Sequence, residues 1–173
     1  MIVEGLLAVR CGISAAGLAG LALLCASPAK AQDIEWRVYD DAEHGCELEY
    51  PATIFAADAE RPNEPRRFSS SDENIYFRVL GTTNSAGWTP AEIKQKYLGS
   101  SMPGKVVYER TKNEFLVLSG YRNGNIFYTK VVVSDDRRVA CILDVTYPRA
   151  MKQKFDEIVT RMSRSFEVAS ASQ

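Results

Sequence analysis

Residues 114–147 read EFLVLSGYRNGNIFYTKVVVSDDRRVACILDVTY, and their pattern indicates a sheet of successive strands. Two short polar segments divide it into three runs rich in β-branched and aromatic residues: 114–121, 126–133 and 139–147. The first polar segment contains Asn123-Gly124, a pair that favours a tight hairpin because both turn residues tolerate positive φ. Strands joined this closely run antiparallel, so the sequence predicts an antiparallel meander.

The residues before this stretch continue the strand pattern. Further strands are expected at 67–70 and 74–80, around a turn at 71–73, and at 105–110. The segment 56–67 is polar and contains two prolines, which predicts a surface loop.

Residues 89–92 have the pattern of a helix N-terminus. Thr89 is the expected N-cap, Pro90 occupies the first helical position, and Glu92 completes a capping box. Ile93 and Tyr97 are expected to form the buried stripe of this helix, which we expect to end at Gly99.

A second helix is expected after Pro148, which stops the last strand. Its apolar residues recur at helical spacing, at Met151, Phe155, Ile158 and Met162. This stripe predicts an amphipathic helix packed on a sheet. The expected fold class is therefore α+β, with an antiparallel sheet of about six strands covered by two helices.

The N-terminal residues 1–31 have the order of a secretory signal peptide. Arg10 precedes the apolar run 11–25, which is shorter than the roughly 20 residues of a membrane-spanning helix. Small residues around Ala29 and Ala31 form an A-x-A cleavage site. We expect cleavage after Ala31 and a periplasmic mature protein; secretion, or retention by an uncleaved N-terminal anchor, is the alternative.

The mature chain is nearly neutral. The whole chain has a formal charge of −1, and loss of Arg10, Lys30 and Glu4 changes it to −2. A balanced charge provides no attraction for nucleic acid, which is not expected as a partner. Residues 32–168 contain no repeat or linker, so we expect one domain without a transmembrane segment, followed by a polar tail, 169–173.

Cys46 and Cys141 are the cysteines that remain after cleavage. An even pair in an oxidising compartment favours a disulfide. Alternation places each cysteine on the apolar side of its strand, where it would face the core. We therefore expect a Cys46–Cys141 disulfide, with two unpaired buried thiols as the alternative.

One acidic cluster next to the single histidine has atoms that bind divalent cations: Asp40, Asp41, Glu43 and His44. Its spacing matches neither an EF-hand loop nor a His-x-x-x-His zinc pair. Acidic residues before a strand are usually solvated. No metal site is therefore predicted, and these four residues are the only candidates.

The sequence contains no catalytic motif. A Ser–His–Asp triad would have to use His44, and the serines at 69–71 and 100–101 do not lie in a Gly-x-Ser-x-Gly turn. The stretch 81–87 lacks the Gly-Lys ending of a phosphate loop. No cofactor is expected. Enzymatic activity is not indicated. A catalytic pair of carboxylates that are distant in sequence and meet only in the folded protein stays open as an alternative.

Aromatic residues offer another means of contact. Most are expected in the core or in cross-strand pairs. Trp36 and Trp88 lie in poorly patterned segments, so they are the candidates for an exposed contact.

The order of these elements resembles the PsbP-like α/β/α sandwich, which also occurs in bacterial envelope lipoproteins of the DcrB type. The matching features are LEYP at 48–51, the capped helix from Thr89, the hairpins, Tyr147-Pro148, and a last helix ending in IVTRMSRSF at 158–166. This chain departs from the lipoproteins in having Leu24 before Cys25, which is not a lipobox. The resemblance implies a binding or accessory role and provides no functional residues.

The segments RRFSS at 66–70 and GNIFYTK at 124–130 are similar to a group of uncharacterised exported proteins from alphaproteobacteria. Two functions follow as hypotheses. The first is a periplasmic binding or accessory module that contacts a protein of the cell envelope. The alternative is a small hydrolase or ligand-binding protein that uses His44, the nearby acids and an aromatic pocket.

Overall fold

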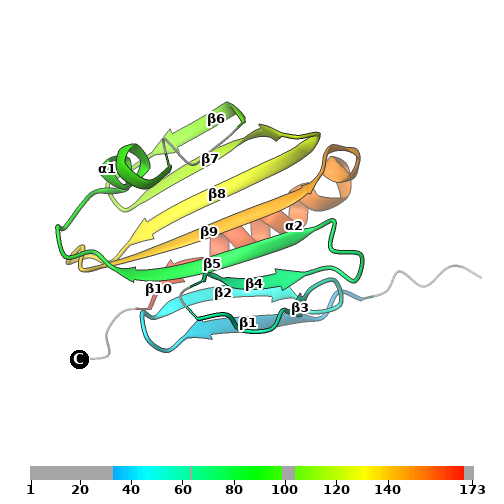
Figure 1. The fold of residues 1–173 in the computed structure, drawn as a ribbon, viewed down its shortest axis with the longest axis horizontal. Helices are drawn as coiled ribbons and strands as arrows, with labels where there is room; N and C mark the ends of the chain where they lie inside the picture. Colours follow the sequence, from blue (N-terminus) through cyan, green and yellow to red (C-terminus); the bar gives the residue numbers. More distant parts are fainter. Residues whose placement is uncertain (1–32, 63, 99–103, 170–173) are drawn as a thin grey trace, which may run out of the picture. The chain divides into compact units, whose positions relative to one another are not determined.

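A computed structural model describes residues 33–62, 64–98 and 104–169, without the side chains of Tyr97 and Leu98 (Figure 1). The expected signal peptide, the expected helix end at Gly99, the buried position of Tyr97 and residues 170–173 of the tail lie outside the described residues.

The main sheet has seven antiparallel strands in the order β3-β4-β5-β9-β8-β7-β6. Their bounds are β3 Ala56–Ala57, β4 Arg66–Ser69, β5 Tyr76–Thr83, β6 Lys105–Thr111, β7 Phe115–Arg122, β8 Asn125–Val133 and β9 Val139–Pro148. The predicted meander is thus confirmed as β6 to β9, and the expected loop at 56–67 contains the short strand β3 and the start of β4.

The hairpin between β7 and β8 has the predicted turn. Asn123 and Gly124 both have positive φ, 49° and 80°, and the flanking residues Arg122 and Asn125 pair in register. This combination matches the right-handed twist of the strands. The asparagine-glycine pair therefore fixes the register between β7 and β8.

The strand β5 lies beside β9, although β6 follows it in sequence. The connecting segment carries the helix α1 (Pro90–Ile93), which continues as a π-helical turn, Lys94–Leu98. It crosses one face of the sheet and brings β6 to the far edge (Figure 1). The edge strand β6 is therefore paired on one side only, with β7.

The start of α1 has the predicted capping box. The Thr89 backbone N–H donates to Glu92 Oε2 at 2.8 Å, and Thr89 Oγ1 accepts from the Glu92 N–H at 3.4 Å. These bonds satisfy backbone groups that a helix start leaves without partners. Ile93 is buried, as expected.

A second sheet has the order β1-β2-β10, with bounds β1 Trp36–Asp41, β2 Cys46–Pro51 and β10 Glu167–Val168. The sequence pattern anticipated about six strands and did not separate this sheet from the main one. The strand β1 alternates only weakly, because Arg37, Val38 and Asp40 are exposed and the other three residues of WRVYDD are half-buried. The pairing of β10 with β2 brings Glu167 and Val168 next to Glu47 and Cys46.

The long helix α2 (Lys152–Ser165) follows a short 3-10 turn after Pro148. Phe155, Ile158 and Met162 of the predicted apolar stripe are buried, together with Val159, whereas Met151 lies half-buried in the preceding 3-10 turn. The helix packs on β2, β8 and β9. Within the described ranges, no helix is long and apolar enough to cross a membrane.

Two apolar cores lie on opposite faces of the main sheet. The larger one joins α2 and the second sheet to the odd-numbered residues of β9, and it contains the stacked pair Phe68 and Phe77 with ring centroids 4.5 Å apart. The smaller one lies under α1 and contains Ile93, Leu118 and Phe127. The fold is the expected α+β sandwich, with helices on both faces.

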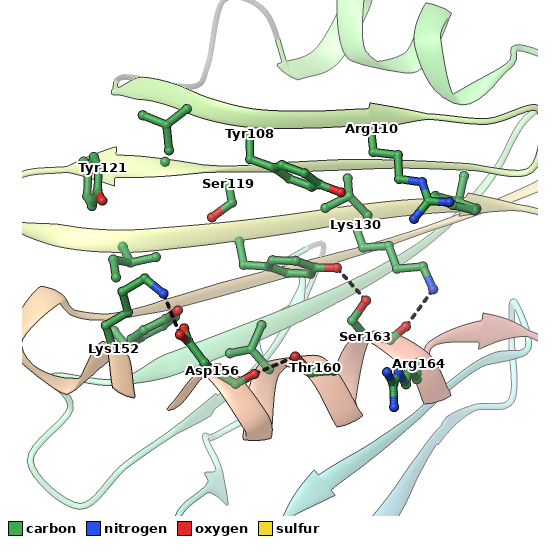
Figure 2. Close-up of a pocket in the computed structure, with 18 residues that line it drawn as sticks. Tyr108, Arg110, Ser119, Tyr121, Lys130, Lys152, Asp156, Thr160, Ser163 and Arg164 are labelled. Carbon is green, nitrogen blue, oxygen red and sulfur yellow. Dashed lines mark hydrogen bonds and ion pairs between the residues drawn. The ribbon is translucent and has the colours of Figure 1, made fainter. Parts of the chain in front are cut away.

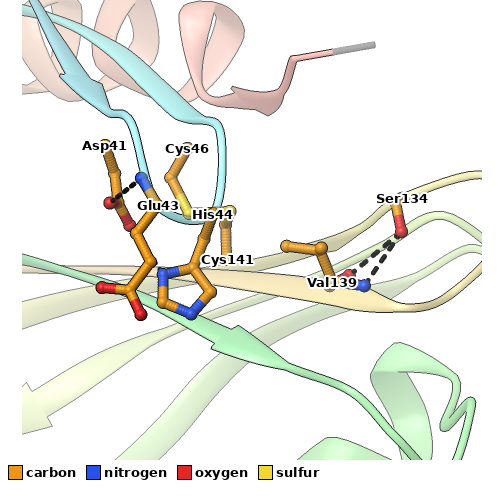
Figure 3. The surroundings of a disulfide bond; sticks show 7 residues. All are labelled: Asp41, Glu43, His44, Cys46, Ser134, Val139 and Cys141. Carbon is orange, nitrogen blue, oxygen red and sulfur yellow. Dashed lines mark hydrogen bonds and ion pairs between the residues drawn. A yellow bond between two sulfur atoms is a disulfide. The ribbon is translucent and has the colours of Figure 1, made fainter. Parts of the chain in front are cut away.

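The predicted disulfide joins the two sheets. Cys46 in β2 and Cys141 in β9 are both fully buried, with Cα atoms 5.8 Å apart (Figure 3). They are 95 residues apart in sequence, so the bond removes much of the freedom of the unfolded chain.

Replacing both cysteines by alanine is expected to lower the free energy of unfolding by about 2–5 kcal/mol, because the unfolded chain regains the entropy of a long open loop. Urea unfolding of the two proteins measures the difference. A difference below about 0.5 kcal/mol, within the range of neutral surface changes, would contradict a stabilising role.

Candidate functional site

An open groove of about 670 Å³ lies on the α2 face of the main sheet (Figure 2). Its floor is formed by β6, β7 and β8, and α2 forms one wall. Volumes of this size are usual for binding sites. The floor carries seven large apolar or aromatic residues: Val107, Tyr108, Phe115, Val117, Tyr121, Ile126 and Tyr128.

The floor follows from strand alternation. Phe115, Val117, Ser119 and Tyr121 line the groove, whereas the intervening Leu116 and Leu118 belong to the core under α1. Side chains of a strand alternate between its two faces, so one strand supplies both a core and a site.

The end of α2 is fixed to the groove floor by two polar side chains. The hydroxyls of Tyr128 and Ser163 are 2.5 Å apart (Figure 2). Lys130 Nζ donates to the backbone carbonyls of Ser163 and Phe166 at 2.7 and 3.0 Å. These carbonyls lie at a helix C-terminus, where a cation is favourable. Burial lowers the pKa of Lys130 and raises that of Tyr128.

The charged residues of the groove are mostly cationic. Arg110, Lys130, Lys152 and Arg164 line it together with a single acid, Asp156. Lys152 Nζ lies 2.5 Å from Asp156 Oδ2, so this acid is already paired. The groove therefore combines an aromatic floor with a positively charged rim.

The open edge of the sheet borders this groove. All seven residues of β6 are exposed, and Val106, Val107 and Tyr108 expose 42%, 54% and 50% of their surface. Among the described strands, only β7 pairs with β6. Unpaired backbone groups beside exposed apolar side chains are a template for another strand.

The acidic cluster near His44 forms part of a separate cleft. His44 Nδ1 lies 3.2 Å from Asp41 Oδ2, in the turn between β1 and β2 (Figure 3). Glu43 lines the same cleft, whereas Asp40 lies on β1 opposite Glu47. Across the described residues, no three His, Cys, Asp or Glu side chains are grouped as metal ligands would be.

The turn containing His44 packs closely on β5. A Cβ atom at Gly81 would lie 2.3 Å from Asp41 Oδ2 and 2.5 Å from His44 Cβ. Only glycine allows this approach, so the pair of Asp41 and His44 has a packing role in addition to any chemistry.

The serines considered as nucleophiles have other partners. Ser69 Oγ donates to Asp58 Oδ2 at 3.0 Å, and Ser70 Oγ donates to Asp72 Oδ1 at 2.6 Å. Ser71 lies in the turn after β4, and Ser100 and Ser101 lie outside the described residues. No serine of the described ranges forms a hydrogen bond with His44.

Both tryptophans are half-buried, at positions away from the groove. The guanidinium of Arg161 lies 4.1 Å from the centre of the Trp36 ring. Lys96 Nζ lies 4.3 Å from the Trp88 ring, which packs against the core under α1. A contact role for either residue stays a prediction.

The groove was not anticipated from the sequence. Strand alternation assigns side chains to one face of a sheet, but it does not show which part of that face a helix leaves uncovered. The exposed Val106-Val107-Tyr108 run on a predicted strand was the available signal.

Comparison with known proteins shows the fold. The chain is similar to cyanobacterial PsbP (CyanoP) from Synechocystis sp. PCC 6803, with a TM-score of 0.59 and 13% identity over 84% of this chain and 99% of that one. It is also similar to the Ran-binding protein Mog1p from Saccharomyces cerevisiae, with a TM-score of 0.53 and 9% identity over 78% and 96%. No family model and no curated protein sequence matches the chain. The fold is PsbP-like, as the sequence resemblance implied.

The raised pKa of the groove residue Tyr147 predicts that the protein loses stability at alkaline pH. Burial, with smaller contributions from Asp156 and Tyr121, raises its pKa to about 12 from 10. As the pH rises, this phenol ionises in the unfolded chain before it ionises in the folded protein. Its contribution to the free energy of unfolding is therefore complete below pH 10 and is lost as the pH rises towards 12.

Tyr147→Phe lacks this ionisation, so its free energy of unfolding should decrease less than that of the wild type, by about 1 kcal/mol at pH 11. Urea unfolding of both proteins at pH 8 and pH 11 measures the difference. An identical decrease in the two proteins would show that Tyr147 does not titrate in this way.

Proposed function

We propose that this chain is an exported accessory module that binds a protein partner of the cell envelope through its groove. Three observations support the proposal. Residues 1–31 have the pattern of a signal peptide, and a disulfide of this kind persists in oxidising compartments. The shared fold also serves protein binding in Mog1p, a Ran-binding protein.

The open edge of β6 beside the groove is the observation that carries the proposal. An extended segment can add to an open edge as a further strand, with main-chain hydrogen bonds providing affinity and alternate side chains providing specificity. The seven residues of β6 span about 23 Å at the strand rise of 3.3 Å per residue. Apolar side chains of the added strand would lie against Val107 and Tyr108 at the mouth of the groove.

The rim charges indicate the chemistry of the partner segment. Arg110 and Arg164 lie on opposite sides of the groove, on β6 and α2, and neither forms an ion pair with a described residue. Carboxylates complement such guanidinium groups and steer association. The proposed occupant is therefore an extended segment of a protein, acidic and with apolar residues at alternate positions.

The hypothesis of a small hydrolase or ligand-binding protein would use the other cleft, with His44 and Asp41. The two hypotheses separate experimentally, because His44 does not line the groove. Substitution His44→Gln should leave partner binding unchanged if the groove is the binding site, and should abolish it if the cleft is used.

The mature protein is expected to begin at Gln32. Intact mass measurement of the protein purified from the periplasmic fraction of its own cells tests the position of cleavage. A mass that starts at Gln32 and lacks two hydrogens would fit export and the disulfide. A full-length mass would contradict cleavage.

The groove itself is tested by site-directed photo-crosslinking in the envelope. A benzophenone residue at Tyr108 is expected to crosslink one protein through an acidic extended segment, identified by mass spectrometry. The same residue at Val38, which is 63% exposed on β1, is the matched control and should not crosslink it.

A synthetic peptide of the captured segment then measures affinity. The double variant Arg110→Glu/Arg164→Glu should bind it at least about tenfold more weakly, because two favourable charge contacts become repulsive. Arg138→Glu, which reverses an exposed charge in the β8–β9 turn, is the matched control. Equal affinity of the groove variant and the control would overturn the proposal.

A further inference from the structure

A small apolar pocket of about 310 Å³ lies on the sheet face that carries α1. The short helix packs on β7 and β8, whereas the pocket lies over β5 and β9. Leu80 of β5 and Ile142 of β9 line it and are opposite each other in the register. Trp88 and Ile93 line it from the segment that follows β5 and includes α1. We call this cavity the Trp88 pocket.

Strand alternation directs the apolar side chains into the Trp88 pocket. Val79 and Leu143 belong to the larger core on the opposite face of the sheet, so their neighbours Leu80 and Ile142 face the α1 side. Leu80 is 38% exposed, whereas Val79 is 2% exposed. A large apolar side chain that is open to solvent inside a cavity offers surface to a ligand.

Hydrogen bonds of Asn84, which is only 5% exposed, hold one wall of the pocket. Its side-chain Nδ2 donates to the Trp88 carbonyl at 2.9 Å, and the Trp88 N–H donates to Asn84 Oδ1 at 3.0 Å. The Asn84 backbone N–H donates to the carbonyl of Arg138 in the β8–β9 turn at 2.6 Å. Thr89, the N-cap of α1, comes directly after Trp88. The wall is therefore formed before a ligand enters, as is usual for small-molecule sites.

The lining of the Trp88 pocket disfavours a charged ligand. None of the described residues that line it is charged, and Lys96, whose Nζ lies 4.3 Å from the centre of the Trp88 ring, is not among them. A charged group that loses its water without an opposite charge nearby pays a large cost in free energy. The polar groups of the lining are the Asn84 amide and the hydroxyls of Thr82, Thr83 and Ser85. A hydroxyl both donates and accepts, so it suits a neutral polar group.

The volume of the pocket and the indole ring of Trp88 indicate the size and shape of the ligand. The volume is at the lower end of the range for small-molecule sites, which fits one ring with a short substituent. An aromatic ring gains from Trp88, because offset or edge-to-face ring pairs add to the free energy of burial.

We propose that the Trp88 pocket binds a small, uncharged aromatic molecule that carries a hydroxyl or carbonyl group. Its ring lies against Trp88, Leu80 and Ile142, and its polar group forms a hydrogen bond with a hydroxyl of the lining. The site is independent of the groove, which lies on the opposite face of the sheet. Trp88 lines neither the groove nor the cleft that contains His44.

Quenching of Trp88 fluorescence tests the proposal. The chain has two tryptophans, so Trp88 is the remaining one in Trp36→Phe. Bromine quenches tryptophan on contact, and 4-bromobenzyl alcohol, 4-bromobenzoate and 4-bromobenzylammonium share a brominated ring and differ in charge. The alcohol should quench to saturation with a dissociation constant below about 1 mM, and both ions should bind at least about tenfold more weakly. Quenching by the alcohol without saturation, or equal affinity for either ion, would overturn the proposal.

Isothermal titration of the mature protein with 4-bromobenzyl alcohol provides a measurement without the Trp36→Phe change. One site per chain is expected. Absence of binding here would overturn the proposal whatever the state of the fluorescence variant.

A charge placed in the pocket locates the site. Leu80 is 38% exposed, so Leu80→Glu should fold normally, as circular dichroism will show. It should weaken binding of the alcohol at least about tenfold. Val38→Glu, the same change at an exposed position of β1, is the matched control and should leave the affinity unchanged. Equal affinities of these two variants would contradict the proposed position.

A further variant separates the Trp88 pocket from the cleft that contains His44, because Leu80 lines both. His44→Gln should leave the affinity for the alcohol unchanged, since His44 does not line the Trp88 pocket. If His44→Gln abolished binding, the ligand would lie in the cleft and the proposal would be wrong.

Discussion

The strand β9 is buried on both faces, and every other layer of the protein packs around it or pairs with it through the main sheet. Its odd-numbered residues, Cys141, Leu143 and Val145, are completely buried in the larger core. On the other face, Ala140 belongs to the core under α1, and Asp144 and Thr146 are buried. Because β9 pairs with both β5 and β8, it aligns the two halves of the main sheet. The main sheet therefore carries a separate apolar core on each face, one under α2 and one under α1.

Local signals explain why much of the fold was predictable. The Asn123-Gly124 turn, the capping box at Thr89 and the apolar stripe of α2 each depend on residues close in sequence, and each element formed as expected. The disulfide followed from two cysteines on the apolar sides of their strands. Pairings between strands that are distant in sequence were harder to predict. The strand β1 alternates too weakly to be recognised, and the pairing of β5 with β9 requires a crossover that no local pattern specifies.

The sites illustrate the same limit. The groove collects residues from three strands and one helix, and its shape depends on where α2 ends on the sheet, which Lys130 and Tyr128 fix through Ser163. The sequence drew attention instead to residues rare in the chain, His44 and the two tryptophans. In the structure, His44 packs against Gly81 and Trp36 lies against Arg161. Rarity of a residue type therefore did not indicate the position of the groove.

The disulfide also divides the chain into a covalent ring and two arms. The ring, residues 46–141, contains every strand of the main sheet except the last part of β9, and α2 belongs to the C-terminal arm. During synthesis the chain emerges from its N-terminal end, so both cysteines are present before α2 has been completed. The sulfur atoms are completely buried once α2 and the second sheet are in place. An oxidant therefore has better access to the two sulfur atoms before α2 packs than in the completed fold.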